Sequence, residues 1–173
     1  MNEKFYNEIK NILNIARNKV YKTANFVMVE AYWNIGKSII EEQGGNEKAE
    51  YGAGLIQELS KQMTQDFGKG FTVTNLKYMR QFYLMFPNSH ALRDELSWTH
   101  YRLLIKVEND NAREFYMQEA AKSQWSTRQL ERQINSFFYE RLLSSKNKKQ
   151  VADEIQTLEP AKKPEDIIRD PYV

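Results

Sequence analysis

A Gly-Lys-Gly turn at residues 68–70 lies between two stretches with helical apolar spacing, and this arrangement constrains the fold most. In residues 51–67 apolar side chains recur every three or four positions, which predicts a helix with one apolar stripe. Glycine directly after a helix adopts the left-handed backbone that ends it. Thr72 then has the residue type of a helix N-cap. The sequence predicts a second helix from there to residue 86.

The second predicted helix divides into an apolar stripe and a polar face. The stripe consists of Leu76, Met79, Tyr83 and Phe86. The opposite face carries Thr74, Lys77 and Gln81, with Tyr78 and Arg80 beside it. In helix–turn–helix proteins such a helix lies in the DNA major groove, but the same corner also occurs as ordinary helix packing. The pattern alone leaves both interpretations open.

The N-terminal part of the chain predicts further helix. Residues 3–20 have the spacing of an amphipathic helix, and a second apolar pattern covers residues 26–40. The two segments form either one bent helix or a hairpin broken near residues 22–23. Gly36 weakens the second segment as a helix, so we expect it at a close helix–helix approach.

The C-terminal part repeats the helix entry seen at Thr72. Ser97 is a predicted cap, and Ser126 with Gln129 forms a predicted capping box that opens a helix through Leu143. Three prolines then interrupt a polar segment with little to bury, which is typical of an extended tail. The sequence predicts an all-α fold of six or seven helices over residues 1–145, followed by a tail over residues 146–173.

Charge is unevenly distributed along the 173 residues, although the net charge is only +2. Residues 61–106 contain seven Lys or Arg against three Asp or Glu, and residues 122–149 contain seven against two. Positive segments attract nucleic-acid phosphates. The predicted DNA contacts, drawn from these two segments, are Lys69, Thr72, Thr74, Asn75, Lys77, Tyr78, Arg80, Gln81, Arg128 and Arg132.

Catalytic and metal-ligating patterns are not evident in the sequence. Cysteine is absent, the two histidines have no ligand spacing, and Glu8 and Lys10 point to different sides of a helix. We therefore predict no enzyme activity, no metal and no cofactor for this chain. It has no apolar run of 18 residues and no signal peptide, so we expect a cytoplasmic protein without a membrane partner.

Several separated motifs resemble the N-terminal domain of YhcG-like bacterial proteins. They are YGAGLIQELS, DFGKGFTVTNLKYMRQFY, LSWTHYRLL, REFYMQEAAKSQWSTRQLERQI and the closing DPYV, in this order and over nearly the whole chain. In that family a helical, helix–turn–helix-like domain precedes a PD-(D/E)XK nuclease domain. The resemblance implies a DNA-binding module, with duplex DNA as partner and the nuclease domain joined in cis after the tail.

A second hypothesis is a helical module for dimerisation or protein interaction without direct DNA contact. The aromatic content of 13% suits that role as well, and a homodimer is compatible with both hypotheses because dimeric helix–turn–helix proteins bind paired half-sites.

Overall fold

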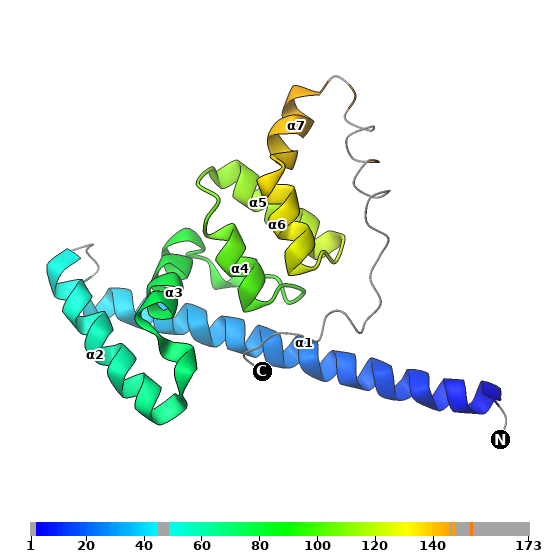
Figure 1. Ribbon diagram of the computed structural model, residues 1–173, viewed down its shortest axis with the longest axis horizontal. Helices are drawn as coiled ribbons and strands as arrows, with labels where there is room; N and C mark the ends of the chain where they lie inside the picture. Colours follow the sequence, from blue (N-terminus) through cyan, green and yellow to red (C-terminus); the bar gives the residue numbers. More distant parts are fainter. Residues whose placement is uncertain (1–2, 45–48, 146, 148–152, 154–173) are drawn as a thin grey trace.

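The structure is a computed structural model that describes residues 3–44, 49–145, 147 and 153 (Figure 1). Its elements are α1 (Glu3–Glu42), α2 (Ala49–Phe67), the 3-10 turn η1 (Lys69–Phe71), α3 (Val73–Met85), the 3-10 turn η2 (Ser89–Ala91), α4 (Trp98–Leu104), α5 (Asp110–Lys122), α6 (Thr127–Asn135) and α7 (Phe138–Ser144). The described part contains no strand, so the all-α prediction is confirmed. Apart from Asn147 and Asp153, the predicted tail lies outside the described residues.

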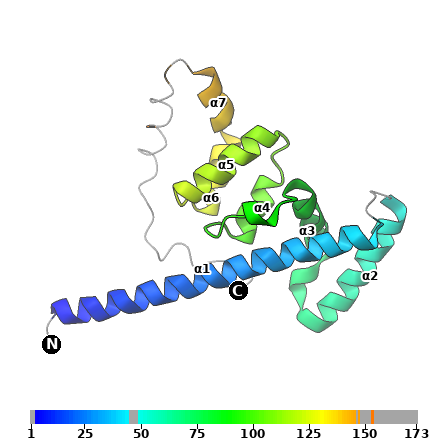
Figure 2. The same ribbon diagram turned by 180° about the vertical axis from the view of Figure 1, so that it is seen from behind.

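The first 40 described residues form one continuous helix, α1. Of the two alternatives left by the sequence, the structure therefore has the single helix and not the hairpin broken near residues 22–23. The C-terminal half of α1 packs along α3, while its N-terminal end extends beyond every other described element (Figures 1 and 2). Helices α3, α4, α5 and α6 gather on one side of the C-terminal half. The core therefore lies at one end of a long rod.

Gly36 marks the crossing of α1 and α3. A Cβ atom placed on it would lie 2.0 Å from the carbonyl oxygen of Met79 in α3. The expected close helix–helix approach is confirmed, since any side chain at Gly36 would collide with backbone. This crossing fixes the orientation of α3 on the long helix.

Aromatic rings fill the space between α3 and α4. Phe82 is fully buried, with its ring centroid 4.8 Å from that of Tyr101 and 5.4 Å from that of Trp98. The buried face of α3 differs from the predicted stripe. Phe82 is buried together with Leu76, Met79 and Phe86, while Tyr83 is only half-buried. The reason is that α3 contacts both α1 and α4, so its buried face is wider than one stripe.

Tyr101 makes the stability of the fold depend on pH in the alkaline range. Burial raises the pKa of its hydroxyl well above the ordinary value for tyrosine, against the weaker effect of the hydrogen bond from the Arg93 backbone N–H (2.7 Å). Above about pH 10 the Tyr101 hydroxyl therefore loses its proton in the unfolded chain but keeps it in the folded chain. Because ionisation then favours the unfolded chain, the free energy of unfolding falls as pH rises. We expect urea unfolding between about pH 9 and 11 to show this fall, and Tyr101→Phe to weaken it.

The same variant has a cost at neutral pH, where losing the hydroxyl leaves the Arg93 N–H without its acceptor and lowers stability by about 1 kcal/mol. Tyr116 is shifted in the same direction, so part of the alkaline loss remains in Tyr101→Phe. An equal pH slope in the wild type and the variant would contradict the assignment to Tyr101.

Helix entries follow the predictions closely. Ser126 and Gln129 form the capping box, in which the Gln129 side chain accepts from the Ser126 N–H (2.6 Å) and the Ser126 hydroxyl accepts from the Gln129 N–H (3.3 Å). At Ser97 the box is closed by His100, whose Nδ1 lies 2.8 Å from the serine hydroxyl and 3.2 Å from its backbone nitrogen. The sequence predicted the cap but not its histidine partner.

The final predicted helix, from Ser126 through Leu143, is wrong in one respect. Phe137 has a left-handed backbone (φ 53°), which ends α6 and starts α7 in a new direction. The break allows Phe138 to become buried against Phe115 and Trp125. Without a glycine or proline at this position, apolar spacing alone gave no sign of the break.

Candidate nucleic-acid interface

The turn between α2 and α3 is held by side chains on both sides. Gly68 ends α2 with a positive φ (85°), a backbone that glycine adopts without strain, and η1 follows it directly. The Ser60 hydroxyl of α2 donates to the Phe71 carbonyl (2.8 Å), and the Asn75 amide of α3 donates to the Gly70 carbonyl (2.6 Å). The turn is therefore a fixed connection that sets the angle at which α3 begins.

The N-terminus of α3 is open to solvent. Thr72 caps the helix, because its hydroxyl accepts from the Asn75 N–H (3.2 Å), and the Thr72 residue itself is exposed. Lys69, three residues earlier, is exposed as well. Free N–H groups, the positive end of the helix dipole and a nearby lysine together favour an anion such as a phosphate.

The outer face of α3 is free of other described elements. Thr74, Lys77 and Gln81 are all exposed, although Leu76 and Met79 on the other face have no exposed surface. Burial of Lys77 and Gln81 under another helix would have excluded a groove-binding role for α3. These three side chains lie at spacings of three and four residues, so they share one surface.

Three other predicted contacts of α3 have partners within the fold. Asn75 uses its amide twice, since its oxygen also accepts from the Trp98 indole N–H (3.1 Å). Arg80 is half-buried and donates from Nε to the Gln43 side chain (2.8 Å). Tyr78 is half-buried, and the Arg102 guanidinium lies over its ring at 4.9 Å. In this structure Asn75 and Arg80 connect α3 to its neighbours.

Arg102 is the residue at this surface that sequence reasoning missed. It comes from α4, stacks on Tyr78 and has a buried Nε without a hydrogen-bond partner among the described residues. The sequence gave only a weak sign, namely its position in the basic segment 61–106. Stacking on a tyrosine of α3 required the tertiary contact between α3 and α4, which no local pattern predicts.

Arg128 and Arg132 are exposed on α6. Helix α6 packs on α4 and α7, so these arginines belong to a separate part of the surface from the α3 face, with α4 between them (Figure 1). A ligand that contacts both must extend across α4.

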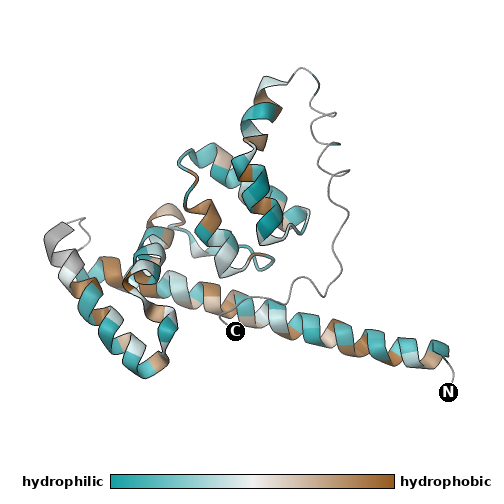
Figure 3. Cartoon of the chain, viewed as in Figure 1, coloured by the Kyte–Doolittle hydropathy of each residue, from teal (hydrophilic) through white to brown (hydrophobic). Residues whose placement is uncertain are grey.

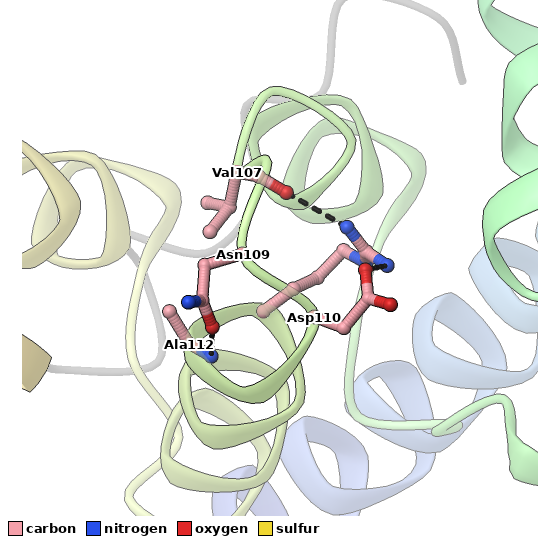
Figure 4. Close-up of polar contacts among 5 residues, drawn as sticks. Val107, Asn109, Asp110 and Ala112 are labelled. Atoms are coloured by element: carbon pink, nitrogen blue, oxygen red, sulfur yellow. Dashed lines mark hydrogen bonds and ion pairs between the residues drawn. The ribbon is translucent and has the colours of Figure 1, made fainter.

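Arg113 shows that some of the chain's positive charge is used inside the fold. Its side chain is buried, donates to the Val107 carbonyl (2.8 Å) and pairs with Asp110; Figure 4 labels these two partners. The adjacent Asn109 caps α5 by accepting from the Ala112 N–H (2.9 Å). This arginine fixes the α4–α5 connection and leaves little of its surface for a ligand.

The described residues contain no group of three or more His, Cys, Asp or Glu side chains placed to hold a metal ion. His100 is buried, with its Nε2 2.9 Å from the Trp125 carbonyl, so both ring nitrogens have partners within the fold.

An open groove of about 470 Å³ lies between α1 and Asp94, lined partly by Lys19, Lys22 and Phe26. None of the described helices combines the length and apolar character needed to cross a membrane.

Comparisons with known proteins give one family and one named relative. The DUF1016 N-terminal domain family matches residues 8–141. The chain is 33% identical over 204 aligned residues to a protein of Escherichia coli (strain K12) named "Putative nuclease YhcG", and this alignment covers 99% of the chain. The chain spans about half, 54%, of that relative's length. No solved structure gives a significant match. The family match spans most of the chain and the relative matches nearly all of it, so the chain belongs to the DUF1016 N-terminal domain family, as the YhcG-like motifs indicated.

Proposed function

We propose that this chain is a DNA-binding module that positions DNA for a nuclease domain, with α3 as the element that enters the major groove. The observation that carries the proposal is the solvent-exposed face of Thr74, Lys77 and Gln81 on a helix whose other face is fully buried. Groove-binding helices need this division, because one face must hold the scaffold while the other meets base edges. The relative's printed name, a nuclease, supports the same class of ligand.

Each part of the surface has a different expected role. Lys69 and the N–H groups of the Thr72-capped first turn contact phosphate, which sets the register of α3 on the duplex. Thr74 and Gln81 supply hydrogen bonds to base edges, and Lys77 supplies charge beside them. Tyr78 holds Arg102 by stacking, so the pair presents a guanidinium next to the groove-facing helix. Arg128 and Arg132 add a phosphate contact on the far side of α4.

The test is fluorescence anisotropy with duplex, single-stranded and branched DNA over a salt series. Lys77→Ala is expected to lower duplex affinity and to reduce the slope of log affinity against log salt by about one. Gln81→Ala, on the same face but uncharged, is expected to lower affinity without changing that slope. Lys4→Ala serves as the control, because Lys4 is exposed near the start of α1, away from α3.

The proposal fails if Lys77→Ala binds duplex with wild-type affinity and slope. It also fails if Lys4→Ala changes both quantities as much as Lys77→Ala does, since the attraction would then be spread over the whole chain. Arg80 is a poor choice for this test, because its bond to Gln43 links α3 to the end of α1.

A further inference from the structure

Residues 3–27 of α1 expose an apolar surface that the proposed DNA-binding role does not use. Most of its large apolar side chains lie within an arc of roughly 120° around the helix, given 100° per residue, while the exposed Ile15 and Tyr21 lie on either side of that arc. The members of this surface, the α1 stripe, are Phe5, Tyr6, Ile9, Ile12, Leu13, Val20 and Val27. Each is between 42% and 67% exposed. Figure 3 shows the corresponding brown bands on the projecting end of α1.

The α1 stripe points away from the rest of the fold. Further along the same helix, Val29, Gly36 and Ile40 are buried and define its inner side. Stepping back from Val29 along that inner side at helical spacing gives mostly polar residues, namely Asn25, Lys22, Asn18, Asn14, Asn11, Asn7 and Lys4, with Ile15 as the apolar exception. The apolar side of α1 therefore changes from inner to outer near Val27. A straight helix cannot turn both faces to one core, so the stripe needs a partner on its own side.

The size of the stripe is that of a protein interface. With about 200 Å² for a large side chain, the exposed fractions amount to roughly 700 Å² of apolar surface. The largest apolar patch on a typical monomer is about 300–600 Å². One partner in a stable complex of standard size buries about 800 Å². The stripe is thus large enough to support a dimer by itself.

We infer that a second copy of this chain covers the α1 stripe, forming a parallel pair of α1 helices. Tyr6, Leu13, Val20 and Val27 are spaced seven residues apart, the repeat of one seam position in a two-helix coiled coil. Ile9, Ala16 and Thr23 follow the first three of them at an interval of three, which is the other seam position. The repeat ends at Glu30 and Asn34, where the inner side of α1 enters the core.

The charges beside the seam favour a copy in parallel orientation. In this register Lys10 and Arg17 occupy one flanking position and face Phe5 and Ile12 of the second copy. Lys19 on the other flank faces Ala24 in the same way. No like charges meet, and the lysine and arginine stems extend the apolar contact. An antiparallel pair would instead bring the basic flanks of the two copies together.

A membrane surface is the competing partner, and the polar side of the helix disfavours it. Helices that lie on membranes carry many Lys and Arg on their polar face. Here that side has five asparagines, at positions 7, 11, 14, 18 and 25, against two lysines, Lys4 and Lys22. Asparagine offers no attraction to anionic lipid. A helix partner therefore suits the residues of α1 better.

Sedimentation or light scattering over a concentration series tests the pairing. The full chain is expected at twice its monomer mass at micromolar concentration. Leu13→Glu with Val20→Glu places two charges in the seam and is expected to give a monomer at concentrations at least tenfold higher. Asn7→Glu with Asn11→Glu puts the same charges on the opposite, exposed side of the same helix and is expected to remain dimeric. Circular dichroism checks that each variant stays helical.

Because the chain has no cysteine, a single introduced one tests the orientation. In a parallel pair Leu13 meets Leu13 of the second copy, so Leu13→Cys is expected to form a disulfide under mild oxidation, whereas Asn11→Cys is not. A dimer in which Leu13→Cys fails to link would overturn the parallel arrangement. A wild-type chain that is monomeric at all concentrations would overturn the pairing, and binding of that monomer to anionic vesicles would identify the membrane as the partner.

Discussion

Gly36→Ala is expected to destabilise the protein by about 2–4 kcal/mol, although alanine is the better helix former. The new Cβ would lie 2.0 Å from the Met79 carbonyl oxygen and 2.7 Å from its carbonyl carbon. Both atoms belong to the backbone of α3, so no side-chain rotation relieves the contact. Helix propensity returns only about 1 kcal/mol, which is less than the cost of separating α1 from α3. Urea unfolding monitored by circular dichroism measures the difference.

Gly54→Ala is the matched control. Gly54 is an exposed position within α2, and a Cβ placed on it meets no atom within 4 Å. The same change is therefore expected to stabilise the protein by up to about 1 kcal/mol, because only the gain in helix propensity remains. Equal effects of the two substitutions would contradict the tight crossing of α1 and α3. The comparison separates a contact between helices from a property of glycine itself.

The sequence predicted those features of the fold that depend on local chemistry. The stop at Gly68, the cap at Thr72 and the capping box at Ser126 each depend on residues within four positions, and each is present. The use of Gly36 was also predictable, because a glycine inside an apolar helical pattern needs a packing reason.

Tertiary contacts decided what the sequence left open or placed wrongly. Phe82 is buried because α4 covers a second side of α3, and the turn at Phe137 exists because Phe138 fits against Trp125. At the candidate site, Asn75 has the residue type of a base-reading amide, but the Trp98 indole and the Gly70 carbonyl occupy it. Periodicity identifies the face of a helix without showing which neighbour uses it.

The amphipathic pattern of residues 3–20 is a related case. The sequence predicted its helix, and the structure describes one, yet the apolar side faces away from the chain's own core. Apolar residues at helical spacing indicate that one face of a helix is buried, but they do not indicate which molecule covers that face. The structure shows which side of α1 faces the core, and in residues 3–27 that side is mostly polar. The apolar side of this segment therefore has no partner within the described fold.

The double variant Leu13→Glu with Val20→Glu, the α1 seam variant, is expected to lose about 100-fold in affinity for a long duplex, which is the largest functional effect we predict. If two copies pair in parallel, their α3 helices lie at the same end of the pair, and one duplex engages both. The second contact then forms at high effective concentration, so separating the copies removes avidity without altering either α3 surface. Leu13→Glu with Val20→Glu is compared by anisotropy on duplexes of about 30 and about 12 base pairs, of which only the longer holds two sites.

The control for added negative charge is again Asn7→Glu with Asn11→Glu, which keeps the seam and is expected to bind the long duplex as the wild type does. Lys77→Ala completes the comparison, because it should weaken binding to both lengths while the protein remains a dimer. An equal loss on both duplexes in the seam variant would mean that α1 contributes to the DNA surface directly and would contradict the avidity argument. Loss on the long duplex alone requires both proposals together, since it needs paired α1 helices and an α3 face that binds DNA.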